Sequence, residues 1–142
     1  MPDTLTPSER SARMARIKGR DSHPEMIVRR VVSGLGYRYR LHRGDLPGRP
    51  DFAFVGRRKV IFVHGCFWHR HEADSGCKLA RLPKSRLDFW LPKLEGNRVR
   101  DMRDQERLRS MGWDFLVIWE CQLGDLAPLA ERIRAFLAHE IN

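Results

Sequence analysis

The amino-acid sequence predicts an α/β domain, in which a mixed sheet of about four strands is flanked by helices on both faces. Three observations lead to this prediction. Segments with helical periodicity alternate with short runs that are nearly continuous in apolar residues. The expected elements follow the order α-α-β-β-β-α-β-α. The length of 142 residues fits one domain covering residues 1–142, with no internal repeat, low-complexity segment or linker.

The first expected helix covers residues 6–18, where Thr6 can act as the N-cap. Its apolar stripe is thin: Met14 and Ile17 stand among arginines. Two interpretations remain open for residues 1–20. They form either a weakly docked arm with solvated charges or an arm that lies on DNA and directs apolar wedges toward the bases. The helix pattern alone favours the first.

Three further helix signals follow. Ser22 can cap a helix over residues 23–33, which makes Glu25 a capping glutamate, with a role near the active site as the second choice. A short helix at 85–90, interrupted by Pro92, precedes a long helix over 97–111. Asp125 caps a last helix that ends near residue 139. Each of the three longer helices has one face that we expect to be buried. In helix 23–33 this face consists of Met26, Ile27, Val31 and Val32. In helix 97–111 it consists of Val99, Met102, Leu108 and Met111, and in the last helix of Leu126, Leu129, Ile133, Phe136 and Leu137.

Four segments read as strands. Residues 37–42 alternate between polar and apolar side chains and predict a half-buried strand. Residues 51–55 and 59–63 are apolar and predict a hairpin at the buried centre of the sheet, with a tight turn at 56–58. Residues 113–120 predict another apolar strand, which delivers Cys121 at its end.

The charge balance points to a polyanionic partner. The chain has 27 Lys and Arg against 18 Asp and Glu, a net charge of +9. Nucleic acid is the usual partner of such a protein, although an inert basic surface would have the same charge. The three cysteines form an odd count without a secretory leader, and the longest apolar run is too short for a membrane span. We therefore expect a soluble, cytoplasmic protein.

The cysteines suggest a structural metal site. Cys66, His71, Cys77 and Cys121 make a set of three thiolates and one imidazole, which is typical of structural zinc. The set includes every cysteine of the chain. Ligation of a metal would also fix the conformation of residues 64–84, a segment without clear periodicity. The alternative is that Cys66 and Cys121 are small buried hydrophobic residues.

The histidines and Asp51 suggest a nuclease centre. Asp51 begins a central strand, and His64 ends the neighbouring one. Mg²⁺ needs only one or two protein carboxylates when phosphate and water complete its octahedron. Zinc requires only one of His64, His69 and His71, so two remain near Asp51 to move protons. On Asp51 alone, a turn aspartate is the better interpretation.

Phe67 and Trp68 are consecutive aromatics in the irregular segment, and Trp90 lies in the next one. On a basic protein, exposed aromatics suit base stacking or insertion between base pairs. Core packing beneath the loop remains an alternative for at least one of them.

Two runs carry a resemblance to a known family. Leu-Pro-Gly-Arg-Pro-Asp-Phe at residues 46–52 and His-Gly-Cys-Phe-Trp-His at 64–69 resemble the very-short-patch repair (Vsr) mismatch endonucleases, and the resemblance extends from Met14 to Cys121. It implies a fold similar to type II restriction endonucleases with an added structural zinc. It also implies Mg²⁺-dependent nicking of double-stranded DNA on the 5′ side of the thymine in a T·G mismatch, which arises when 5-methylcytosine deaminates. A nick on one strand needs only a monomer, and other repair proteins are expected partners.

The resemblance also implies roles for individual residues. Asp51 and the Val63 carbonyl would hold Mg²⁺, His69 oriented by Asp101 would activate water, and His64 would assist at the phosphate. Cys66, His71, Cys77 and Cys121 match zinc ligands. Phe67, Trp68 and Trp90 match aromatics that enter DNA from one groove, Met14 and Ile17 match wedges from the other, and Lys93 and Asn97 match positions that read the mismatched pair. The resemblance therefore favours the DNA-contacting role for residues 1–20.

This sequence departs from the family pattern at two places. Residues 72–76 lengthen the interval between His71 and Cys77, and Val63 stands where a small polar residue is common. Two other functions remain as alternatives: a Vsr-like nickase with a different sequence target, and a zinc-stabilised DNA-binding module without catalysis.

Overall fold

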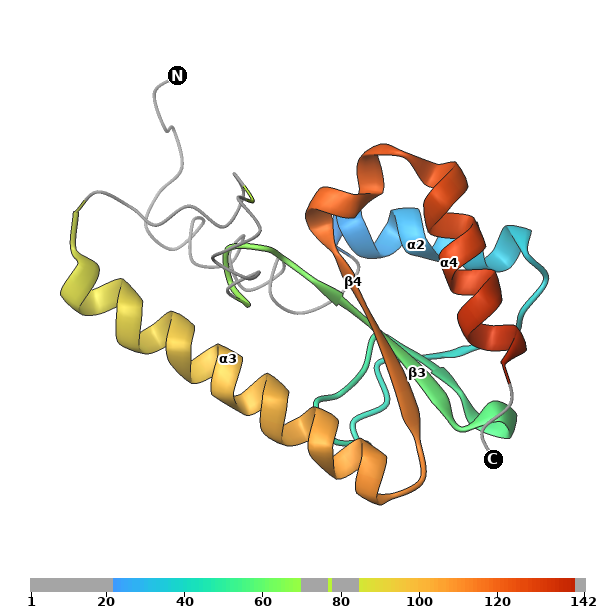
Figure 1. Ribbon diagram of the computed structural model, residues 1–142, viewed down its shortest axis with the longest axis horizontal. Helices are drawn as coiled ribbons and strands as arrows, with labels where there is room; N and C mark the ends of the chain where they lie inside the picture. Colours follow the sequence, from blue (N-terminus) through green and yellow to red (C-terminus); the bar gives the residue numbers. More distant parts are fainter. Residues whose placement is uncertain (1–21, 70–76, 78–84, 140–142) are drawn as a thin grey trace, which may run out of the picture.

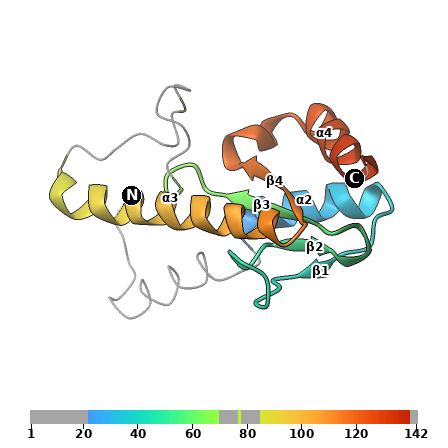
Figure 2. The same ribbon diagram turned by 60° about the horizontal axis from the view of Figure 1, so that its bottom comes forward.

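The computed structural model describes residues 22–69, 77 and 85–139. A four-stranded mixed sheet lies between one long helix, α3, and a pair of helices, α2 and α4 (Figures 1 and 2). The predicted α/β class with helices on both faces is confirmed. The expected helix at 6–18, with Met14 and Ile17, and the expected zinc ligand His71 lie outside the described residues.

The sheet has the order β1-β2-β3-β4. β1 (Arg40–Leu41) is antiparallel to β2 (Phe52–Phe54), which forms the predicted hairpin with β3 (Lys59–His64). β4 (Asp114–Trp119) runs parallel to β3 and forms the other edge. β2 and β3 are nearly entirely buried, so the expectation that the hairpin forms the centre of the sheet is confirmed. β1 is shorter than the predicted 37–42.

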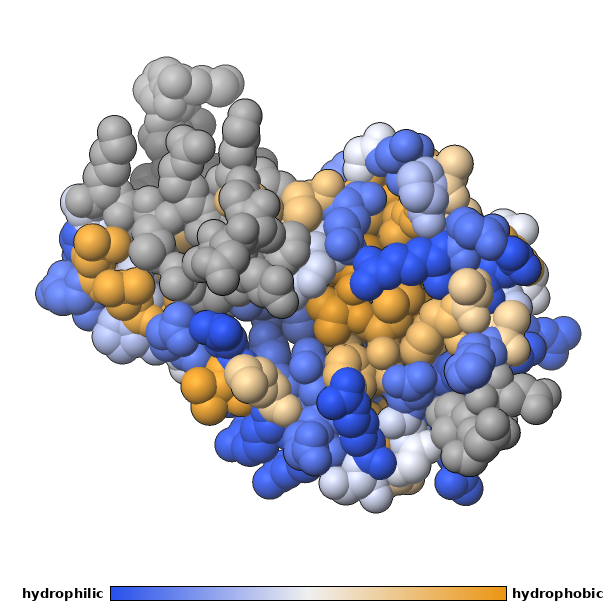
Figure 3. All heavy atoms as spheres, in the orientation of Figure 1, coloured by the Kyte–Doolittle hydropathy of each residue, from blue (hydrophilic) through white to orange (hydrophobic). Residues whose placement is uncertain are grey.

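The sheet separates two groups of core residues. On one face, Val28 and Val32 of α2 (His23–Gly34) pack with Phe52, Ile61 and the inner side of α4 (Leu126–Ala138). On the other face, Val60, Phe62 and Ala53 pack with Leu108 of α3 (Leu87–Ser110). Figure 3 shows that apolar surface also gathers over β4, between α3 and α4. Among the described helices, none has the length and apolar character that crossing a membrane requires.

Both predicted helix caps are present. The Ser22 side chain accepts from the Glu25 N–H at 3.4 Å, and the Asp125 side chain accepts from the Ala127 N–H at 3.4 Å. At the other end of α4, Arg57 and Lys59 donate to the Leu137 and Phe136 carbonyls. Basic groups stabilise the negative end of a helix dipole, so this contact fixes α4 to the hairpin.

The prediction for α3 was wrong in two respects. The helix is continuous from Leu87 through Pro92, rather than a short helix followed by a separate one at 97. Pro92 is the sixth residue of α3 and cannot donate to the Asp88 carbonyl, but the loss of one hydrogen bond does not end a helix of 24 residues. The expected buried residues Val99, Met102 and Met111 are 61%, 60% and 47% exposed.

The reason lies in what the inner face of α3 covers. Leu94 and Leu108 are fully buried, and the partly buried residues at helical spacing between them are polar: Asn97, Asp101 and Asp104. The inner face of α3 therefore carries polar groups that border a pocket. The apolar residues Val99, Met102 and Met111 lie on its outer, exposed face. In α4, Leu126 is also exposed, against the prediction.

Candidate active site

Asp51 lies where the loop between β1 and β2 enters the sheet. Gly48 in this loop has a φ of +78°, and a Cβ there would lie 2.9 Å from the Phe62 ring, so the close approach of the loop to β3 requires glycine. The Asp51 carboxylate accepts the Val63 N–H at 2.7 Å. The loop and the strand thus fix the carboxylate over the end of β3.

The Val63 carbonyl points toward the same place. The N–H and C=O of a strand residue point to the same side, and the Val63 N–H points to Asp51. The pairing of β2 with β3 ends at Phe52↔Ile61, and two residues beyond that pair stand Pro50, just before β2, and Val63 of β3. Proline has no N–H to donate, so this neighbour cannot bond the Val63 carbonyl. The Val63 carbonyl is therefore a candidate oxygen ligand near the Asp51 carboxylate.

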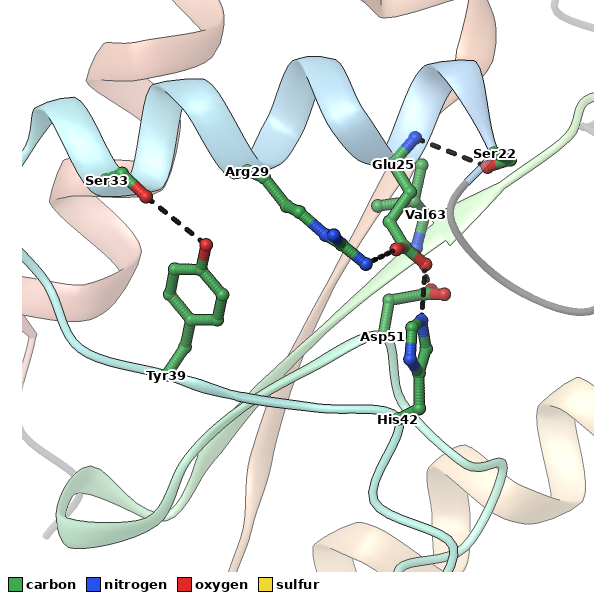
Figure 4. Close-up of polar contacts among 8 residues, drawn as sticks. All are labelled: Ser22, Glu25, Arg29, Ser33, Tyr39, His42, Asp51 and Val63. Carbon is green, nitrogen blue, oxygen red and sulfur yellow. Dashed lines mark hydrogen bonds and ion pairs between the residues drawn. The ribbon is translucent and has the colours of Figure 1, made fainter.

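A second carboxylate, Glu25, joins Asp51 from α2 (Figure 4). Glu25 is 1% exposed, and its oxygens contact Arg29 at 2.5 Å and His42 Nε2 at 2.7 Å. Donor atoms of Glu25, His42 and Asp51 lie within 4.8 Å of one another, a spacing that could hold a metal ion. Burial raises the pKa of Asp51, the hydrogen bond from the Val63 N–H lowers it, and the nearby Glu25 raises it. The net result is a pKa of about 7.

The sequence interpretation of Glu25 was incomplete. Its backbone N–H does bond the Ser22 cap, but its side chain turns away from the cap and into the site. The second choice, a position near the active site, is the one that the structure favours for the side chain. His42 was missed, because a histidine at the end of a strand gives no pattern that separates it from any polar residue there.

His64 and His69 lie beside the carboxylates. Their rings stack with centroids 3.9 Å apart, and His69 Nδ1 bonds Asp101 Oδ2 of α3 at 2.6 Å. Since a carboxylate accepts the Nδ1 proton, the second ring nitrogen, Nε2, is left as the proton acceptor of a neutral His69. Burial lowers the pKa of His64 to about 3, with a smaller contribution from His69, so His64 is neutral at neutral pH. Its Nδ1 is buried and has no hydrogen-bond partner among the described residues.

The predicted aromatic residues form one cluster. The Phe67 ring lies 5.2 Å from Trp68 and 5.4 Å from Trp90, and the two tryptophans lie 6.0 Å apart. Phe89, which the sequence interpretation missed, packs on Trp90 at 5.1 Å and is 46% exposed. Lys93 Nζ lies 5.9 Å from the Trp68 ring. The cluster is therefore only partly covered and borders solvent.

Asn97 connects this cluster to α3. Its amide donates to the Trp68 carbonyl at 3.0 Å, and its oxygen accepts from Arg100. The contact holds the Trp68 loop against the helix.

These groups meet around one open pocket of about 890 Å³. The predicted site residues that line it are Asp51, Val63, His64, Trp68, His69, Lys93, Asn97 and Asp101. Arg49 and Arg100 add positive charge to its walls. The pocket thus combines oxygen ligands, proton acceptors, an aromatic edge and cations, which is the chemistry required for hydrolysis of a phosphodiester.

The three cysteines form a separate cluster. The Sγ atoms of Cys66, Cys77 and Cys121 lie within 4.8 Å of one another, although the residues are far apart in sequence. Burial raises the pKa of Cys66 to about 12 and also raises the pKa of Cys121. Cys66 is buried, in keeping with the alternative interpretation, but a purely apolar role would not bring the exposed Cys121 and the half-buried Cys77 to the same point. The lengthened interval before Cys77 does not prevent it from joining the others.

Comparison with known proteins agrees with this geometry. Residues 2–75 match the family model "DNA mismatch endonuclease Vsr". The chain is 49% identical to a type II nicking enzyme of Xanthomonas oryzae pv. oryzae, over 96% of this chain and 98% of the relative. It is 37% identical to a type II nicking enzyme of Neisseria meningitidis serogroup A over 100% and 98%. It is 42% identical to the DNA mismatch endonuclease Vsr of Escherichia coli K12 over 87% and 76%. The chain belongs to the Vsr DNA mismatch endonuclease family.

Proposed function

We propose that this protein nicks double-stranded DNA with a divalent cation, on the 5′ side of the thymine in a T·G mismatch. The observation that carries the proposal is the pocket where Asp51, the Val63 backbone and the His69–Asp101 pair meet beside the aromatic cluster. A fold similar to type II restriction endonucleases, the repair of deaminated 5-methylcytosine, and action as a cytoplasmic monomer belong to the same proposal.

The donor atoms fit Mg²⁺. In the cluster of Glu25, His42 and Asp51, two side chains offer carboxylate oxygens, and the Val63 carbonyl that the resemblance implies would add a third oxygen. Mg²⁺ takes one or two carboxylates together with water and phosphate. When bound there, Mg²⁺ would supply positive charge at the scissile phosphate and lower the pKa of a bound water.

The protein side chains would then perform the proton transfers. Asp101 holds the Nδ1 proton of His69, so Nε2 accepts a proton from the attacking water. His64 is neutral and acts at the phosphate as a hydrogen-bonding group rather than as a charge. Arg49, Arg100 and Lys93 line the same pocket and bind neighbouring phosphates.

The aromatic cluster would supply the preference for a mismatch. A mismatched step is poorly stacked, so inserting Phe67, Trp68 and Trp90 there costs less than the few kcal/mol of a normal step. Lys93 and Asn97 lie beside Trp68, in position to read the displaced pair. Residues 1–20, with Met14 and Ile17, would contact the DNA from the other groove.

The cysteine cluster fits zinc. Sulfur ligands about 2.3 Å from one tetrahedral ion lie roughly 4 Å apart, within the 4.8 Å that bounds this cluster. Cys66, Cys77 and Cys121 would hold Zn²⁺ with His71 as the fourth ligand. The ion would fix the loop that carries Phe67 and Trp68.

A second candidate is a nickase with another target, because two of the most similar relatives are named type II nicking enzymes. Single-turnover nicking with Mg²⁺ on a T·G duplex, its matched A·T and G·C counterparts and the single strands separates the candidates. We expect cleavage 5′ of the mismatched thymine only, in a panel of flanking sequences. Nicking of a matched duplex would show the second candidate, and binding without cleavage would leave only a DNA-binding module.

A further inference from the structure

We propose that His42 is a positioning residue that holds the Glu25 carboxylate beside Asp51, so that the two carboxylates present one cation site. The inference rests on the proposed function, because it concerns the cation that the nicking reaction uses. Its basis is geometric: His42 contacts Glu25 through its side chain (Figure 4). Its backbone N–H also donates to the Asp51 carbonyl.

His42 occupies a special place in the chain. It directly follows β1, and its backbone has a φ of +50°, in the left-handed region that few residues other than glycine adopt. Its N–H donates to the Asp51 carbonyl at 3.2 Å, and its Nε2 lies 2.7 Å from Glu25 Oε1. The same residue thus fixes the backbone that carries one carboxylate and the side chain of the other.

The direction of the His42–Glu25 bond follows from the partners of Glu25. Arg29 donates to the other Glu25 oxygen at 2.5 Å, so both Glu25 oxygens act as acceptors in these contacts. An ionised carboxylate only accepts, so His42 Nε2 carries the proton and donates it.

The burial of Glu25 explains why two donors are needed. An unpaired carboxylate at 1% exposure would be strongly destabilising, and Asp51 is a second acidic group in the same cluster. Without His42, the Glu25 carboxylate would lose the contact that fixes its Oε1 oxygen and could turn toward Arg29 on α2. A small displacement of a ligand costs much of its contribution to the site.

Direct ligation by His42 is the competing interpretation. His42 Nε2 is already engaged with Glu25, and Mg²⁺ prefers oxygen ligands. We therefore assign His42 the positioning role, and the variants compared next distinguish positioning of Glu25 from direct ligation of the ion.

The test compares His42→Gln and His42→Leu in the full-length, zinc-loaded chain. Glutamine can place an amide N–H near the position of the imidazole Nε2, and leucine cannot donate. Asp45→Asn is the matched control, since it breaks the exposed Arg43–Asp45 ion pair in the same loop. Mn²⁺ binding is measured without DNA by the electron paramagnetic resonance signal of the free ion. Single-turnover nicking is measured against Mg²⁺ concentration, and DNA affinity and thermal melting are recorded for each variant.

We expect His42→Leu to weaken Mn²⁺ binding and to raise the Mg²⁺ concentration for half-maximal nicking by about tenfold or more, as for other losses of a supporting contact. His42→Gln should restore most of the Mn²⁺ affinity and most of the wild-type Mg²⁺ dependence. Both quantities should stay within about twofold of wild type in Asp45→Asn, and so should the DNA affinity of every variant. Wild-type Mn²⁺ binding in His42→Leu would overturn the inference. So would an equal defect in His42→Gln, which would show that the imidazole itself ligates the ion.

The Mn²⁺ measurement separates this inference from the proposed function. If Mn²⁺ binds, depends on Asp51 and responds to His42, the positioning role holds even when no DNA tested is nicked. If Asp51→Asn leaves Mn²⁺ binding unchanged, the cation site of the proposed function fails, and the inference fails with it. If nicking and Mn²⁺ binding depend on Asp51 but not on His42, only the inference fails.

Discussion

The carboxylate centre (Glu25, His42 and Asp51) and the cysteine cluster (Cys66, Cys77 and Cys121) both bring three potential ligands within 4.8 Å, but they are built differently. The carboxylate centre is held by the fold itself: a capped helix, the end of β1 and the Val63 N–H each fix one part. The cysteine cluster joins Cys66, which follows β3, to Cys121 in the short helix after β4 and to Cys77. We infer that an ion in the first centre serves chemistry, whereas an ion in the second serves structure.

The largest expected effect comes from Asp51→Asn. Nicking should fall by about a thousandfold or more, because a metal contributes several kcal/mol of charge stabilisation and each 1.36 kcal/mol is tenfold in rate. DNA affinity should stay within a few-fold. Single-turnover rates and a binding titration on the same duplex measure the two, and a variant that still nicks would remove Asp51 from the cation site.

The same substitution should raise stability. A carboxyl whose folded pKa of about 7 exceeds its usual 3.8 stabilises the fold below pH 4 and loses that contribution as the pH rises through 7. Asparagine has no such loss, so in Mg²⁺-free buffer at pH 8 the variant should be more stable by on the order of 2 kcal/mol. Denaturant unfolding at pH 4 and pH 8 tests this, and an equal difference at both values would contradict it.

A smaller effect is expected when the cysteine cluster is broken. The wild type should contain one zinc per chain by metal analysis. Cys121→Ser should lose most of it, with a fall in Tm of about 5–10 °C, the shift that 2–3 kcal/mol gives in a domain of this size. Withdrawal of Mg²⁺ from the wild type is the contrasting control and should leave Tm nearly unchanged. A metal-free protein with the wild-type Tm would show that the cysteines are core residues.

The smallest effect concerns the aromatic edge between the two centres. Trp68→Ala should reduce the preference for T·G over a matched pair by about tenfold, since stacking of one aromatic on a base contributes about 1–3 kcal/mol. Trp68→Phe keeps a ring on the same loop and should retain most of the preference. Competition nicking of the two duplexes in one reaction gives the ratio directly, and an unchanged ratio in Trp68→Ala would assign Trp68 to packing.

The predictions from the sequence succeeded where local patterns agree with the tertiary structure. The hairpin at 51–63, the caps at Ser22 and Asp125, and the strand before Cys121 follow from short-range propensities and are present. They failed for α3, because apolar residues at helical spacing were taken as its buried face. That helix covers a polar pocket, so Asn97 and Asp101 face inward and Val99 faces solvent.

The sequence by itself determined the class of the fold, the candidate ligands and the family, because these depend on residue types and their local order. Only the tertiary structure decided which ligands meet. Glu25 and His42 lie 17 residues apart and reach each other only because α2 packs across the sheet whose first strand ends just before His42. Contacts of this kind depend on how elements pack, and no local pattern in the chain encodes that packing.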